Sequence, residues 1–190
     1  MGFIISLQLL SGQKFVEGRP YSQEKDVNPH LESIILPYVN NHDMLEEDEY
    51  AKPGKPFRYG FIHDENIRAS THGKWEKTAD GGLLWQIIIE SEGAYAIGFE
   101  YTEFYIPEGG KLYVFSPDYS TIYGAYTFAN NNSERRFSSP LLPGDIAVIE
   151  YYQPAEITQE FTITISEIIH DYRDIMGFAN NGRDWECGVN

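Results

Sequence analysis

The sequence is short of cysteine and of positive charge. Cys187 is the single cysteine in 190 residues, so an internal disulfide is excluded, and a zinc site would need His or carboxylate partners at suitable spacing. Fourteen Lys and Arg stand against 29 Asp and Glu, which gives a formal net charge of −15. Nucleic acids and anionic membranes both select clustered basic residues. We therefore expect no nucleic-acid or membrane partner, and either a basic protein partner or a highly soluble secreted protein.

The usual signatures of catalysis are also missing. There is no G-x-S-x-G turn, and none of the five histidines belongs to an H-E-x-x-H or H-x-H pair. The glycines in "DGG" (80–82) and "EGG" (108–110) are typical of hairpin turns rather than of a phosphate-binding loop. Glu100 and Glu103 lack the context that marks a glycosidase. We therefore expect no active site, no cofactor and no bound metal.

One short stretch leaves a catalytic alternative open. His63 stands beside Asp64 and Glu65 in "FIHDEN", which we interpret as surface residues of a turn between two strands. The alternative is a free-standing enzyme that uses these three residues for acid/base chemistry.

Long hydrophobic runs are scarce. The N-terminal run extends from Phe3 to Leu10 and is too short to span a membrane. Because Ser11 and Gly12 follow it, residues 1–13 are predicted to be a secretory signal peptide, which implies an extracellular or periplasmic protein. The positively charged start of such a peptide is missing, so the run is either a truncated signal or an ordinary apolar strand.

Aromatic residues are abundant, with 14 Tyr, 11 Phe and 3 Trp. Between residues 57 and 175 they fall in short apolar runs separated by Gly, Pro and Asn, which is a β-type composition. Nine runs at this spacing predict an all-β fold, an antiparallel β-sandwich of the jelly-roll kind. The expected strands are 57–63, 66–70, 83–91, 94–106, 111–116, 121–128, 135–139, 145–152 and 160–172.

Alternation within these runs supports the sandwich. In "EFTITIS" the residues Phe161, Ile163 and Ile165 share one face, which is the period of two of a half-buried strand. The pattern slips at Ser166 and Glu167, where a β-bulge would restore the inward face. Trp85 lies in an apolar run and is predicted to be core, whereas Trp75, flanked by lysines, is predicted to be half exposed.

The segment 14–56 has a different texture. It carries five prolines and the acidic run "EEDEY" at 46–50, so we predict an irregular N-terminal extension of the sandwich. The acidic run is interpreted as a solvated loop, with an electrostatic mimic or a cation-binding loop as the alternative. A calcium loop is not favoured, because the D-x-D-x-D-G pattern is absent.

Several motifs recur in an order that resembles a known family. They include "GRPYS" (18–22), "KPFRYG" (55–60) and "HGKWEK" (72–77), and they end with "GFANNGRDWECGVN" (177–190). The order is similar to that of the N-terminal pro-region of secreted bacterial trypsin-like serine proteases of the lysyl endopeptidase type. The matching positions in four central blocks are Trp85, Ile87, Ile89, Ser91, Ala94; Phe104, Pro107, Gly109, Leu112, Tyr113, Val114; Gly144, Asp145, Glu150, Tyr151, Pro154; and His170, Tyr172, Arg173.

The resemblance implies a non-catalytic pro-region that assists folding of a following protease domain and keeps it latent until cleavage. Its expected partner is that downstream domain, and the chain is expected to be a monomer. The family's catalytic His, Asp and Ser would lie after Asn190, so this chain would not be an enzyme. The alternative is a secreted β-sandwich binding module for carbohydrate or a cell-surface ligand, which would use its exposed aromatic residues.

The same resemblance assigns roles to residues near the C-terminus. The stretch "IIHDYRD" leads into residues 176–190, a linker and the start of the protease domain, so His170, Tyr172 and Arg173 are candidate protease contacts. Arg183 is the nearest basic residue to the junction and is the candidate processing site. Cys187 would pair with a downstream cysteine in an oxidising compartment. "GRDWE" replaces the family's usual small residues before that cysteine, which puts the position of the junction in doubt.

Overall fold

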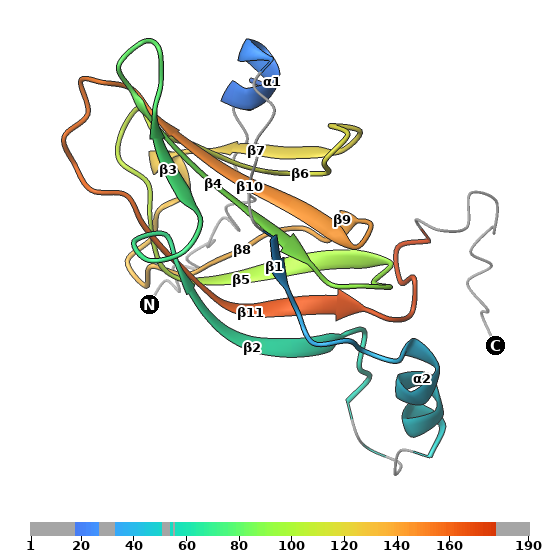
Figure 1. Cartoon of the computed structure of the whole chain (residues 1–190). Coiled ribbons are helices and arrows are strands. Elements are labelled where there is room, and N and C mark those ends of the chain that lie inside the picture. The colour runs from blue at the N-terminus through green and yellow to red at the C-terminus, as the bar shows by residue number, and fades with distance from the viewer. Residues whose placement is uncertain (1–17, 27–32, 51–53, 55, 178–190) are drawn as a thin grey trace, which may run out of the picture.

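The chain folds as a sandwich of two β-sheets, with one short helix above one of the sheets and a second helix at one end of the sandwich (Figure 1). The structure is a computed structural model that describes residues 18–26, 33–50, 54 and 56–177. The predicted signal peptide (1–13), Arg183 and Cys187 lie outside the described residues. The prediction of an all-β sandwich is confirmed.

The first sheet, sheet A, is built around the neighbouring strands β4 and β10. Its strand order is β1-β4-β10-β6-β7, and β3 also pairs with β4. All its pairings are antiparallel except the parallel pairing of β1 with β4. Its strands are β1 (Ser33–Ile35), β3 (Lys74–Lys77), β4 (Leu83–Glu90), β6 (Lys111–Phe115), β7 (Ile122–Tyr126) and β10 (Ile146–Gln153).

The second sheet, sheet B, has the order β2-β11-β5-β8, and β9 pairs with β5. Every pairing in it is antiparallel. Its strands are β2 (Phe61–Arg68), β5 (Ala96–Tyr105), β8 (Phe137–Ser138), β9 (Leu142–Pro143) and β11 (Thr162–Asp171). The described residues thus contain eleven strands where nine were predicted. The two predicted runs at 57–63 and 66–70 form the one strand β2, and β1, β3 and β9 were not predicted.

The core lies between the sheets and follows the predicted alternation. Phe161, Ile163 and Ile165 are all buried, and Phe161 stacks on Tyr151 of the facing sheet with ring centroids 3.7 Å apart. Trp85 is completely buried and Trp75 is 40 % exposed, so both tryptophan predictions are confirmed. Burial of these aromatic side chains, together with the aliphatic residues around them, stabilises the fold.

The predicted bulge in the last strand is also present. The register of β11 shifts between Ile165 and Glu167 against both neighbouring strands. One extra residue changes which side chains face inward. As a result Ile168 and His170, like Ile165, are fully buried, and the strand delivers a histidine to the interior.

The prediction of a surface turn at His63 is wrong. Residues 61–68 form the continuous strand β2, and His63 is only 5 % exposed. Because side chains alternate along a strand, Asp64 points to the opposite, solvent-exposed face. The charged and polar residues that follow His63 suggested a turn, but His63 itself faces the interior of the sandwich.

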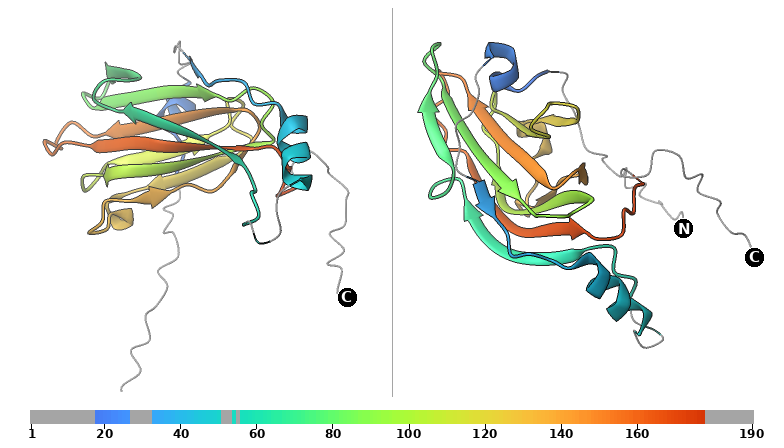
Figure 2. Two further views of the ribbon diagram at one scale, coloured as in Figure 1. Left: turned by 90° about the horizontal axis from the view of Figure 1, so that it is seen from below. Right: turned by 45° about the vertical axis from the view of Figure 1, so that its right-hand side comes forward.

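The segment before residue 57 contains three regular elements. Helix α1 (Tyr21–Lys25) packs against the outer face of sheet A, β1 extends the edge of β4, and helix α2 (Asn41–Glu49) lies at the far end of β2 and β11 (Figure 1, Figure 2). The side chain of Asn40 caps α2 by accepting a hydrogen bond from the backbone N–H of His42 at 3.1 Å. The acidic run at 46–50, interpreted above as a solvated loop, forms the last turn of α2 and its C-cap.

Candidate functional site

The three candidate contact residues of the last strand lie together at the end of the sandwich that carries α2. We call this region the α2 end. Asp48 of α2 is its centre, because its carboxylate accepts hydrogen bonds from three side chains that come from distant parts of the sequence. Tyr172 Oη donates to it at 2.6 Å and Arg58 Nε at 2.6 Å, and Arg173 Nη2 also donates to it.

Asp48 is an electrostatic anchor for the helix. Its side chain is 13 % exposed and forms ion pairs with both arginines. Partial burial raises the pKa of Asp48, but the hydrogen bonds from Tyr172, Arg58 and Arg173 outweigh that effect and hold the pKa below its usual value. Arg173 further donates from Nε to the carbonyl of Arg58 at 2.8 Å. Tyr172 and Arg173 therefore serve to hold α2 on the sandwich.

His170 makes a second attachment between the sandwich and α2. Its Nδ1 lies 2.8 Å from Ser91 Oγ, and its Nε2 lies 2.8 Å from Asn41 Oδ1. Asn41 Nδ2 donates to the carbonyl of Gly93 at 2.8 Å, which assigns Oδ1 as an acceptor. The consistent network has Nε2–H donating to Asn41 and Ser91 donating to Nδ1. His170 is therefore neutral and fully hydrogen-bonded.

The hydrogen-bonded chain of side chains Ser91, His170 and Asn41 has the residue types of a nucleophile, a base and an orienting group. Its placement does not suit that role. Ser91 is 1 % exposed and His170 is fully buried, so no carbonyl group has room to approach the hydroxyl. His170 instead connects Ser91, which follows β4, to Asn41, the first residue of α2.

His63 completes this buried region. Its ring lies 6.3 Å from that of His170 and 4.9 Å from that of Phe61. Burial lowers the pKa of His63. Burial and the nearby His63 lower the pKa of His170 to about 4, although Asp145 acts in the opposite direction. Both imidazoles are therefore neutral at pH 7, and Asp64 and Glu65 do not converge on them as a catalytic set would.

Several large apolar side chains in α2 and in the segments next to it are exposed, although most residues of the helix itself are polar or acidic. Tyr50 is 80 % exposed and Phe57 is 68 % exposed, and the guanidinium of Arg173 lies 4.8 Å from the Phe57 ring. Clustered exposed aromatic side chains mark protein-interaction surfaces. We call this set the aromatic surface of the α2 end; its exposed large apolar residues are Tyr38, Leu45, Tyr50, Phe57, Tyr59, Ile62 and Met176.

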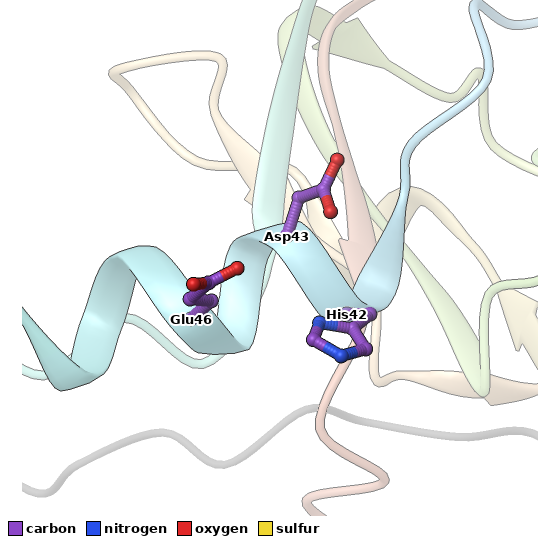
Figure 3. Close-up of side chains that lie close together, drawn as sticks. All are labelled: His42, Asp43 and Glu46. Atoms are coloured by element: carbon purple, nitrogen blue, oxygen red, sulfur yellow. The ribbon is translucent and has the colours of Figure 1, made fainter.

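His42, Asp43 and Glu46 gather on the exposed side of α2 (Figure 3). Their ligand atoms lie within 4.8 Å of one another, which is a spacing that a cation could bridge. All three side chains are exposed, and acidic residues three positions apart are frequent on helices that hold no metal. The prediction that the chain binds no metal stays a prediction.

The opposite side of the sandwich carries α1. Glu150 of β10 is completely buried there and accepts from the backbone N–H of Ser22 at 3.3 Å and from Gln86 Nε2 at 2.7 Å. Burial raises the pKa of Glu150 despite these hydrogen bonds. The ring of Tyr21 stacks on Tyr152 with centroids 4.9 Å apart. These contacts fix α1 on the outer face of sheet A.

Two adjacent cavities open beside α1. A smaller one of about 130 Å³ and a larger one of about 590 Å³ share Tyr21, Lys25 and Asp80 in their walls. We call the two together the α1 cleft. The larger cavity falls in the size range of small-molecule sites. This cleft could not be anticipated from the sequence, because its walls come from α1, from β3, β4 and the turn between them, and from the strands β6 and β10.

Sequence reasoning placed His170, Tyr172 and Arg173 in one neighbourhood and missed Asn41, Asp48, Arg58 and Ser91, which complete it. Of these four residues, only Asp48 lay in a stretch that the sequence marked as unusual, the acidic run at 46–50. No known family model matches the sequence, and no solved structure matches the chain. Within the described residues no helix is both long and apolar enough to cross a membrane.

Proposed function

We propose that this chain is a non-catalytic pro-region of a secreted bacterial serine endopeptidase precursor, which assists folding of the protease domain and keeps it latent until cleavage. The observation that carries the proposal is the aromatic surface of the α2 end, together with the order of the pro-region motifs. That surface adjoins residues 172–177, where the chain leaves the sandwich. A surface of this kind stabilises a partner's native state when it binds that state and not the unfolded chain.

The site geometry favours residues other than the predicted trio as the protease contact. Tyr172 and Arg173 bind Asp48 within the chain, and His170 is buried. The protease contact is therefore assigned to the exposed residues Tyr50 and Phe57 and to the acidic face of α2. His170, Tyr172 and Arg173, which the sequence predicted as contacts, instead hold α2 on the sandwich. An acidic, aromatic surface favours a partner with basic residues at its interface.

The test begins with the coding sequence after the codon for Asn190. The proposal expects an open reading frame that contains a trypsin-like His, Asp and Ser. That protease domain is then refolded from denaturant with and without this chain supplied in trans. We expect the chain to raise the yield of active protease at least about tenfold, because a bound native state is stabilised by mass action.

Matched variants locate the contact. Phe57→Ala and Tyr50→Ala should each reduce the gain in yield, whereas Phe128→Ala, which removes a half-exposed aromatic ring on η1 (Phe128–Asn130), should not. Equal effects of all three would remove the assignment of the contact to the α2 end. A reading frame that stops at Asn190 would remove the pro-region proposal itself.

Processing is a separate consequence of the proposal. Cleavage by a trypsin-like activity after Arg183 would release the protease domain, and Cys187 would then remain with that domain and pair within it. Arg183→Ala in the full precursor is expected to block or displace processing, as read by N-terminal sequencing of the released protease. Unchanged processing would exclude Arg183 as the site.

A further inference from the structure

A second binding site lies on the other side of the molecule, and it does not depend on the pro-region proposal. We propose that the α1 cleft binds a sugar that carries a carboxylate, a uronic acid. The carboxylate occupies the smaller cavity and receives a hydrogen bond from Tyr113, and the sugar ring occupies the larger cavity.

The hydroxyl of Tyr113 is the first reason. Tyr113 lines the smaller cavity and is 1 % exposed, and its Oη is a buried polar atom with no hydrogen-bond partner. A buried hydroxyl without a partner costs about 1–3 kcal/mol. Of the five side-chain atoms of this kind among the described residues, the Tyr113 hydroxyl is the one whose residue lines the cleft. Burial, with smaller contributions from Glu24 and Glu150, raises the pKa of Tyr113 to about 12. The hydroxyl therefore keeps its proton at neutral pH and can donate.

The basic residues of the cleft are the second reason. Arg19, Lys25 and Lys111 line the smaller cavity and Lys77 lines the larger one. In a chain with only 14 basic residues and a net charge of −15, four cations at one cleft are a concentration of positive charge. Within the described residues the ion pairs engage Arg58, Lys74 and Arg173, and none engages these four.

The cleft walls hold three acidic residues, Glu24, Glu76 and Asp80, against the four basic ones. Asp80 accepts hydrogen bonds from Thr78 Oγ1 at 2.5 Å and Tyr152 Oη at 2.9 Å, and these hydrogen bonds lower its pKa. Glu76 pairs with Lys74 at 2.6 Å. Glu24 is the remaining acid in the wall. The cleft thus presents ammonium, guanidinium and phenol donors, which suit a carboxylate.

The size and lining of the two cavities specify the rest of the ligand. A volume of about 130 Å³ holds a carboxylate and a few waters, each of which takes about 30 Å³ in the liquid. The adjoining cavity of about 590 Å³ combines Leu84 and Tyr21 with the polar residues Lys77, Thr78 and Asp80. A sugar ring has the matching alternation of apolar faces and hydroxyl groups.

The experiment measures binding of D-glucuronate to the whole chain by calorimetry and by backbone NMR shifts. D-glucose carries a hydroxymethyl group in place of the carboxylate, and acetate lacks the sugar ring. We expect glucuronate to bind at least about tenfold more tightly than either, because a hydrogen bond to a charged group contributes about 1.5–3 kcal/mol. No saturable binding of glucuronate, or equal binding of glucose, overturns the proposal. Equal binding of acetate overturns the assignment to a sugar.

Two variants place the ligand. Tyr113→Phe should weaken glucuronate binding about tenfold while the melting temperature of the free protein stays the same or rises, because an unsatisfied hydroxyl is removed. Lys111→Gln should weaken binding severalfold, and Arg136→Gln, a charge-matched change at an exposed residue beside β8, should leave it unchanged. Loss of stability without loss of binding in Tyr113→Phe would show that the tyrosine is structural and would overturn the site.

A further arm identifies the source of the ligand. A glucuronic-acid disaccharide that binds more tightly than the monosaccharide would point to a polysaccharide chain running along the cleft. Equal affinity would point to the free acid sugar. Both results support the site, and a disaccharide that fails to bind supports a closed pocket for the monosaccharide alone.

Discussion

The two helices of this molecule are attached to the same sandwich in opposite ways. At the α2 end the charged side chains are matched within the chain, with Asp48 accepting from Arg58, Arg173 and Tyr172. At the α1 cleft the basic side chains are left without ion pairs among the described residues, and the Tyr113 hydroxyl has no partner.

The contrast separates two uses of polar groups. Groups that satisfy each other within the chain stabilise its structure, and any partner must then bind through what remains exposed, which at the α2 end is an aromatic surface. Groups that are held in place but left unsatisfied are available to a small ligand. Sequence motifs drew attention to the first region, whereas the second became visible only in the folded chain.

The largest effect that tests this contrast is expected from Asp48→Ala. Removal of this carboxylate takes away the acceptor that two guanidinium groups and a phenol share, although Arg58 keeps its ion pair with Glu47, and it should lower the free energy of unfolding by about 3 kcal/mol. The measurement is urea denaturation at pH 7. Asp43→Ala, at an exposed position of the same helix, should change stability by less than about 0.5 kcal/mol. Equal effects of the two would contradict the anchoring role.

A pH dependence of stability is the next effect in size. The pKa of His170 is about 4 in the folded chain and about 6.5 when unfolded. Below pH 6.5 the unfolded chain binds a proton that the folded chain does not, so stability should fall by about 3 kcal/mol as the pH drops from 6.5 to below 4, and should level off at lower pH. The lowered pKa of Asp48 acts in a lower window, because its contribution is lost only as the pH falls below about 4.

The control for the pH experiment is His170→Gln, which keeps hydrogen-bonding capacity without a titrating group. Its free energy of unfolding, measured in the same buffers, should be nearly flat between pH 6.5 and pH 4 apart from a smaller contribution of His63. A slope as steep as that of the unaltered chain would show that other groups cause it.

Asn41→Ala should have a moderate effect. The change removes the acceptor of His170 Nε2 and the donor to the Gly93 carbonyl, and we expect a loss of about 1–2 kcal/mol. Thermal denaturation of this variant beside His42→Ala, which alters an exposed neighbour, provides the comparison. A neutral result for Asn41→Ala would mean that α2 is held by Asp48 alone.

Lys111→Gln should have the smallest effect on stability. Within the described residues Lys111 forms no ion pair, so its replacement should change the free energy of unfolding by less than about 0.5 kcal/mol. Guanidinium denaturation of the free protein checks this value. A large loss would mean that the cleft's positive charge serves the fold, and the contrast between the two helices would disappear.

Much of the sandwich could be predicted because side chains of a strand point alternately to the core and to solvent, so the pattern of apolar residues shows which of them are buried. Phe161, Ile163 and Ile165 alternate with polar residues and face the core, and the slip after Ser166 correctly predicted a bulge. Trp85 could be assigned to the core from its apolar neighbours. These features depend on local sequence, which a single chain displays.

The site could not be predicted because its contacts are non-local. Asp48 and Arg173 are 125 residues apart, and Asn41 and His170 are 129 apart. The inward direction of His63 was missed because the charged residues after it suggest a turn. Tyr113 offered no sign in the sequence that its hydroxyl lacks a partner, since that depends on the packing of α1 against sheet A.

The short strand β1 has a consequence for solubility. It pairs in parallel with Ile88, Ile89 and Glu90 of β4, while β3 pairs with residues 83–86 of the same edge. Between them the two strands cover an edge whose exposed N–H and C=O groups would otherwise recruit a strand from another molecule. The N-terminal segment thus protects the sandwich against aggregation. A chain that begins at residue 57 would lack β1 and would expose this apolar edge of β4 to other molecules.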